Sequence, residues 1–191
     1  MKTLLMALAL TGDPANVESV EFLKIKLAAP PPPVCPIETL SSGTRMYMRP
    51  RDGSSCVKPF AVTRPAPLPT GPKYTLEAWV SSAPRGIEMV TVEVLDGLVE
   101  SVNVTTNGYE SQAAILSALE DRFGKPEVSS SDPVQTAMGA SFEALRASWT
   151  VGDVGIQFHG ILGRINQGNV RASTRKGHED LERTYGDRGS F

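Results

Sequence analysis

The side chains in this sequence that could do chemistry are two cysteines, two histidines and scattered serines and carboxylates. Neither His159 nor His178 is matched by a serine or cysteine in the strained, glycine-flanked context of a nucleophile elbow. The serine-rich run Ser129–Ser131 also lacks that flanking. We therefore expect no catalytic residue and a protein that is not an enzyme, with hydrolysis open as an alternative.

The carboxylates and glycines form no ligand site either. The acidic pairs Glu120-Asp121 and Glu179-Asp180 join neighbours in sequence, and neighbours on a helix point in different directions, so we interpret them as solvated charges. The glycine spacing in Gly160–Gly168 matches neither the dinucleotide fingerprint nor the phosphate loop. The sequence predicts no metal ion and no cofactor.

Cys35 and Cys56 lie in a stretch rich in proline, glycine and serine, where a loop-rich segment needs a covalent link. We predict a disulfide bond between them, which by the chain-entropy argument contributes roughly 3 kcal/mol. Such a bond indicates an oxidising compartment. Two free thiols in a cytoplasmic protein are the alternative. A zinc site would need two further ligands, and both histidines are far away in sequence.

The first residues resemble a secretory signal, because Lys2 precedes the short apolar run Leu4–Leu10, although no A-x-A cleavage site follows. A short buried strand or a frayed start is the alternative. The run is too short to span a bilayer as a helix, and no lipid-anchoring cysteine follows it. We expect residues 1–12 to form a signal-like segment and the protein to be periplasmic or secreted.

Length and charge narrow the classes of partner. A chain of 191 residues, 40% hydrophobic and 21% charged, fits one domain or two small ones. The net charge of −2 and the mixing of acidic and basic residues give no electrostatic footprint for nucleic acid. We expect no nucleic-acid partner and no integral membrane span.

A hairpin is predicted from two β-rich runs, Ile87–Val94 and Leu98–Thr105. A two-residue turn would place the valines of the two strands on opposite faces. A three-residue loop over Leu95–Gly97 places them on one face, so we predict that loop. It points Glu100 toward the apolar face, which suggests a position near the sheet edge, where the carboxylate reaches water.

A helix is predicted next, over Tyr109–Phe123, from apolar residues at helical spacing. Gly124 and Pro126 mark its end. A second hairpin follows in Phe142–Val151 and Val154–Ile161, where a two-residue turn puts six apolar residues on one face.

The segment Ser129–Gly139, before the second hairpin, is polar and contains a proline and a glycine. This composition predicts a mobile loop.

The elements predict an α+β fold: an antiparallel sheet of two hairpins, flanked by strands near Tyr74 and Val170, with one amphipathic helix packed on one face. We expect this core domain over residues 73–176. A proline-rich segment before it predicts a boundary with a disulfide-tied N-terminal lobe over residues 13–72. The charged residues 177–191 predict a flexible tail.

Four short motifs carry a family resemblance: Asp96–Val102, the helix end Leu119–Pro126, the strand Ala147–Trp149 and the Cys35-Pro36 context. They resemble uncharacterised bacterial periplasmic proteins whose layout is similar to the β-lactamase-inhibitor-protein and small outer-membrane-protein-A class, over roughly residues 75–175. The resemblance implies a helix-on-sheet module used for protein contacts, without a catalytic centre. It carries over no functional residue.

We therefore expect an exported, non-enzymatic protein that binds a protein partner, not identified by the sequence, through an exposed sheet face or loops. The alternative is a small-molecule-binding or hydrolytic periplasmic protein with its site between the sheet and the 129–139 segment. A flat apolar patch would favour the first, and a cleft lined by His159 and carboxylates the second.

Overall fold

An eight-stranded antiparallel sheet organises the computed structural model, which describes residues 20–80, 83–136 and 139–186. The strands lie in the order β5-β6-β7-β8-β12-β11-β10-β9. Their bounds are β5 Cys56–Pro59, β6 Lys73–Trp79, β7 Ile87–Leu95, β8 Leu98–Thr106, β9 Val128–Gln135, β10 Ser141–Val151, β11 Val154–His159 and β12 Gly168–Thr174. With two helices beside this sheet, the predicted α+β class is confirmed, although the sheet is larger than expected.

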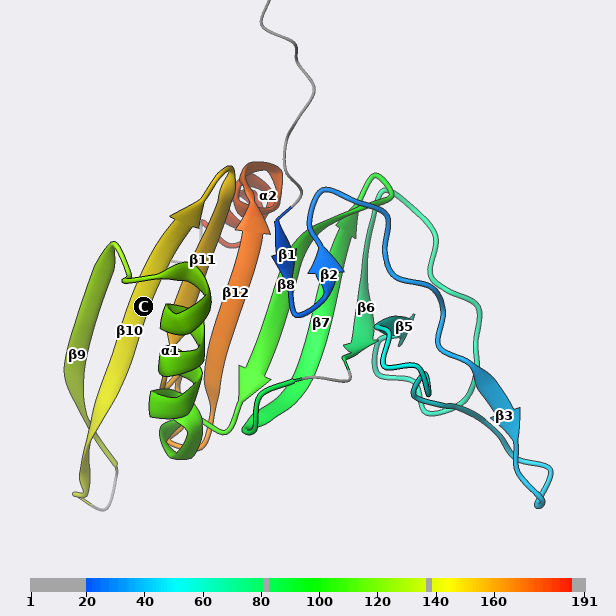
Figure 1. Cartoon of the computed structure of the whole chain (residues 1–191), viewed down its shortest axis with the longest axis horizontal. Coiled ribbons are helices and arrows are strands. Elements are labelled where there is room, and N and C mark those ends of the chain that lie inside the picture. Colours follow the sequence, from blue (N-terminus) through cyan, green and yellow to red (C-terminus); the bar gives the residue numbers. More distant parts are fainter. Residues whose placement is uncertain (1–19, 81–82, 137–138, 187–191) are drawn as a thin grey trace, which may run out of the picture.

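One face of the sheet is covered by two elements. Helix α1 (Tyr109–Phe123) crosses the part of the sheet formed by β10 to β12, and a small hairpin of β1 (Glu21–Phe22) and β2 (Ile25–Lys26) lies in front of β8 and β7 (Figure 1). Phe22 and Phe123 stack with ring centroids 6.2 Å apart, so the two covers meet. Their apolar residues and the strand valines form one core.

The opposite face is polar. Arg171 of β12 donates hydrogen bonds to Glu93 of β7 (2.8 Å) and to Ser101 (3.0 Å) and Asn103 (3.3 Å) of β8. These contacts join three neighbouring strands across the centre of the sheet. The middle of this open face therefore carries charged and polar side chains.

The turn predicted for the first hairpin is wrong. Leu95 pairs with Leu98, so only Asp96 and Gly97 form the turn, instead of three residues. Farther along β8 the register shifts by one, and Glu100 is left as a bulge. The bulge shifts the pairing by one residue, so that the valines of both strands share one face, as predicted.

The second hairpin has the predicted turn and pairing, with Val151 opposite Val154 and Trp149 opposite Ile156. The mobile loop predicted before it is wrong, because β9 pairs with β10 along its whole length. Since β9 is an edge strand, the missing N–H of Pro133 can face solvent without breaking the ladder.

The tail is also more ordered than predicted. Helix α2 spans Arg175–Tyr185, and the Thr174 hydroxyl caps it by accepting from the Gly177 amide at 3.1 Å. Asp180 binds Lys73 of β6 at 2.5 Å, which holds the helix against the sheet. A frayed turn is therefore replaced by a docked helix as far as Tyr185, and residues 187–191 lie outside the described part.

The predicted disulfide between Cys35 and Cys56 is present, with the Cα atoms 4.8 Å apart. Hairpin β3 (Ile37–Thr39) and β4 (Arg45–Tyr47) follows Cys35 as a separate two-stranded sheet. The boundary predicted at residue 72 stays a prediction about folding units. In the structure, β5 pairs with β6 in the main sheet, and Phe22 and Val57 lie in the main core.

Residues 1–12, predicted to be signal-like, lie outside the described residues. Among the helices of the described part, none is long and apolar enough to cross a membrane.

Candidate functional site

The histidines singled out in the sequence lie in different elements. His159 ends β11 and is half-buried, and burial, together with the positive charge of Arg146, lowers its pKa. His178 lies on α2, where it pairs with Glu182 at 3.3 Å in an exposed position. Within the described residues, no three His, Cys, Asp or Glu side chains gather closely enough to hold a metal ion.

The alternative small-molecule site was expected between the sheet and a loop over residues 129–139, but most of this segment is a strand. Residues 128–135 form β9 within the sheet, and Ser131 donates to Glu143 of β10 at 2.6 Å. Residues 128–135 therefore pair with the neighbouring strand β10.

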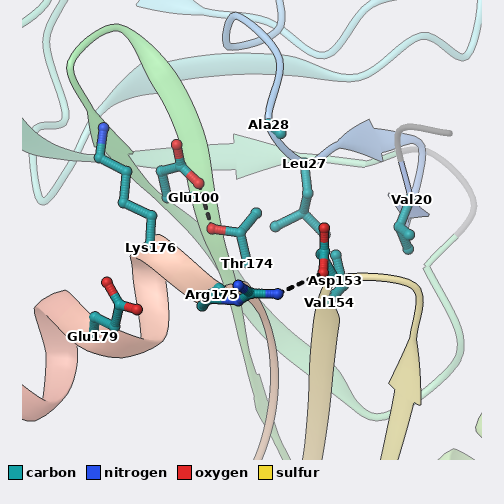
Figure 2. A pocket seen from close by; sticks show the side chains of 10 residues that line it. All are labelled: Val20, Leu27, Ala28, Glu100, Asp153, Val154, Thr174, Arg175, Lys176 and Glu179. Carbon is teal, nitrogen blue, oxygen red and sulfur yellow. Dashed lines mark hydrogen bonds and ion pairs between the residues drawn. The ribbon is translucent and has the colours of Figure 1, made fainter. Parts of the chain in front are cut away.

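A cavity of about 340 Å³ lies elsewhere, where α2, the β10–β11 turn and the residues after β2 meet (Figure 2). We name it the Glu100 pocket. It is lined by Val20, Leu27, Ala28, Glu100, Asp153, Val154, Thr174, Arg175, Lys176 and Glu179. These residues come from five separate stretches of the chain, so only the folded sheet assembles the pocket.

Glu100 provides the buried charge of this pocket. The prediction that it lies near the sheet edge is wrong, because β8 is a central strand and Glu100 is 4% exposed. Its carboxylate accepts a hydrogen bond from the Thr174 hydroxyl. Among the described residues it forms no salt bridge, since the nearby cations bind other acids: Lys176 binds Asp96 at 2.8 Å.

One part of the pocket wall is apolar, formed by Val20, Leu27, Ala28 and Val154. Leu27 is 1% exposed and Val154 is 4% exposed. The Ala28 amide donates to the carbonyl of Val99 in β8 at 2.8 Å, which holds the residues after β2 beside the sheet. Arg175 closes one side through an ion pair with Asp153 at 2.9 Å.

A second feature is the projecting β3–β4 hairpin, which we name the hairpin arm (residues 36–49). It extends away from the main sheet on the side of β5 and β6 (Figure 1). Ile37 pairs with Tyr47 and Glu38 with Met46, so Ile37 and Met46 lie on opposite faces of the hairpin. Ile37 is 40% exposed and Met46 38% exposed, and Leu40 at the turn is 42% exposed.

The base of the arm is held at two places. Cys35 and Cys56 are buried and covalently joined beside Tyr47, which is also buried. The Tyr47 hydroxyl donates to the Ala66 carbonyl at 2.9 Å and accepts from the Ala66 amide at 3.0 Å. A two-stranded hairpin is marginal by itself, and these contacts keep it in place.

The arm carries positive charge. Arg51 pairs with Glu38 at 3.1 Å, while Arg45 and Arg64 have no acidic partner in the described part of the chain. Arg45 and Arg64 line a shared surface pocket beside Gly43. The arm therefore combines exposed apolar side chains with Arg45, and Arg64 lies beside the arm; neither has an acidic partner among the described residues.

Sequence reasoning missed the Glu100 pocket as a site. One signal was present, because the alternation of β8 already pointed the Glu100 carboxylate toward the apolar face. Its contact with Thr174, 74 residues later, could be found only from the folded sheet.

The chain was compared with protein-family models, curated proteins and solved structures, and no match was found. The resemblance to the β-lactamase-inhibitor-protein and small outer-membrane-protein-A class therefore stays a prediction.

Proposed function

We propose that this chain is an exported, non-enzymatic protein-binding module of the bacterial periplasm, and that it binds its partner through the hairpin arm. The observation that supports this most is the exposure of Ile37 and Met46 on opposite faces of one hairpin. Tyr47, opposite Ile37, is buried at the base of the arm, but each face of the hairpin still carries an exposed apolar side chain that could be buried against another protein.

The exposed apolar side chains of the arm are few, as expected for the centre of a larger interface. Leu40, at the start of the turn between β3 and β4, adds a third exposed apolar side chain. A few apolar anchors at the centre of an interface commonly dominate the binding energy. The hydrogen bonds of Tyr47 and the disulfide already hold the base of the arm in place, so binding costs less conformational entropy.

Charge suggests the chemistry of the partner. Arg45 and Arg64 lack acidic partners within the described residues, so a partner surface with carboxylates around an apolar centre would complement the arm. Such an interaction should weaken as salt concentration rises, because exposed charges are screened.

Export is supported by the disulfide, since cytoplasmic thiols are kept reduced. Mass spectrometry of protein taken from its native host without reductant should show a mass two hydrogens below the reduced form. Two free thiols in that sample would contradict export.

The binding proposal can be tested with a photo-crosslinking amino acid placed at Leu40. The control places it at Val128, which is 64% exposed on β9 at the opposite edge of the sheet. In the native host, Leu40 should yield one dominant crosslinked protein that Val128 does not. Arg45→Glu should reduce that product severalfold, and the matched charge reversal Lys125→Glu should leave it unchanged.

Three results would contradict the proposal. The first is an identical set of products from Leu40 and Val128, because it would indicate nonspecific contact. The second is a product that persists in the double variant Ile37→Ser/Met46→Ser, which removes one exposed apolar side chain from each face of the hairpin. The third is a product whose yield does not change with salt.

A further inference from the structure

We infer that the Glu100 pocket binds a small organic cation, a primary ammonium group carried on a short aliphatic chain. This inference goes beyond the proposed protein-binding function and does not depend on it. Two independent observations support it: a cavity of about 340 Å³ with one apolar side, formed by Val20, Leu27, Ala28 and Val154, and the carboxylate of Glu100, a residue that is only 4% exposed and has no salt-bridge partner among the described residues.

The surroundings of Glu100 favour a negative charge at that point. The Thr174 hydroxyl donates to the carboxylate, and Thr174 is the capping residue of α2. Glu100 therefore lies beside the amino end of the helix, where the free N–H groups stabilise an anion. The hydroxyl and the helix end offset the free-energy cost of burying the Glu100 carboxylate less well than a cation in direct contact would.

The cations already near the pocket do not fill this role. Arg175 binds Asp153 at 2.9 Å, and Lys176 binds Asp96 at 2.8 Å. The hydrogen bond to Asp96 is the main cause that raises the pKa of Lys176, and the charge of Glu100 is the weakest contributing cause. Both cations are therefore paired with exposed acids.

The charged side chains of the lining favour a cationic ligand. Arg175 and Lys176 are paired with Asp153 and Asp96. Of the charged residues in the lining, Glu100 and Glu179 have no ion-pair partner within the described part of the chain, and both are negative. An anionic ligand would meet this negative charge, whereas an ammonium group could bind the Glu100 carboxylate directly.

The walls favour an aliphatic chain behind the ammonium group. Leu27 and Val154 are almost completely buried, and Val20 is half-buried beside them at the opening. A saturated chain of several carbons fits a cavity of this volume and gains from leaving water. A hydrated inorganic cation would gain nothing from these walls.

The test uses hexylammonium as the probe and the full-length oxidised protein. Calorimetry and two-dimensional NMR should show one binding site, with shifts concentrated at Ala28, Val154 and Thr174. Neutral 1-hexanol, which has nearly the same shape, should bind at least about tenfold more weakly, because a charge-assisted hydrogen bond is missing. Hexanoate should not bind.

Three variants test whether binding depends on the Glu100 carboxylate and takes place in this pocket. Glu100→Gln should weaken hexylammonium at least about tenfold and leave 1-hexanol unchanged. Glu93→Gln is the matched control, because it removes a sheet carboxylate that already binds Arg171 on the open face, and it should not change binding. Val20→Trp should block the opening and abolish binding even if Glu100→Gln fails to fold.

Two outcomes would overturn the inference. One is equal affinity for hexylammonium and 1-hexanol in the wild-type protein, which would make the pocket an apolar cavity without charge recognition. The other is an absence of saturable hexylammonium binding at this pocket, which includes binding that Val20→Trp leaves intact. In either case, Glu100 would only hold the hydroxyl of Thr174, the capping residue of α2.

Discussion

Reduction of the Cys35–Cys56 disulfide should destabilise the protein by about 3 kcal/mol. The two cysteines are 21 positions apart in sequence, and the chain-entropy model gives a value of that order for a loop of this length. Both thiols would stay buried after reduction, so the loss should come mainly from the unfolded state and not from a new cavity. In a chain of this size, that corresponds to a decrease of roughly 6 to 12 °C in the Tm.

The assay is urea denaturation and thermal unfolding with and without reductant, with the double variant Cys35→Ser/Cys56→Ser as a second reduced form. Hydrogen exchange adds spatial resolution. The Met48 amide, which donates to Pro36 at 2.7 Å, reports on the arm, and the Val92 amide reports on the central sheet. Reduction should accelerate exchange at Met48 far more than at Val92, because the arm opens locally.

An unchanged Tm after complete reduction would refute this reasoning, because it would mean that the disulfide does not lower the conformational entropy of the unfolded chain. Equal acceleration of exchange at Met48 and Val92 would refute the local part of the prediction. It would mean that the arm and the sheet unfold together.

Three further predictions concern the core and the titrating groups. Leu119→Ala should lower the free energy of unfolding by about 2 to 5 kcal/mol, and Leu116→Ala, at a half-buried site, by less. His159→Gln should flatten the loss of stability below about pH 6.5, because burial lowers the pKa of His159 and the unfolded chain therefore binds its proton more tightly. Asp180→Asn should cost about 1 to 3 kcal/mol at neutral pH. Because the hydrogen bond from Lys73 chiefly lowers the pKa of Asp180, the wild-type stabilisation is present above pH 3.8 and is lost as pH falls through the lower folded pKa.

Urea denaturation across a pH series tests all three. Equal losses for the two leucine variants would contradict the packing of α1. A His159→Gln curve parallel to wild type below pH 6.5, or an Asp180→Asn protein as stable as wild type at neutral pH, would contradict the corresponding prediction.

Alternation of apolar residues made the second hairpin predictable, since its turn has no irregularity and Trp149 and Ile156 share one face. The same reasoning failed at the first hairpin because a bulge is one unpaired residue. In sequence, Glu100 looks like any other strand position. The predicted three-residue loop and the observed bulge both bring the valines together, so the face was predicted correctly and the turn was not.

Two elements were missed because tertiary contacts stabilise them. Strand β9 has polar residues on both sides, and its pairing with β10 gives it order that its composition does not indicate. Helix α2 is strongly charged and depends on the contact between Asp180 and Lys73, 107 residues apart. The Glu100 pocket was missed for the same reason, since Thr174 and Leu27 reach it from distant parts of the chain.

Strand β5 has a mechanical consequence for the way this protein responds to force. Cys56 faces the disulfide cluster under the arm, and the next residue, Val57, faces the main core. A pull on the arm would therefore be carried through the covalent bond to a four-residue edge strand, where the ladder to β6 can peel open one pair at a time. The load would reach the edge of the sheet before its central strands, so β5 would yield first.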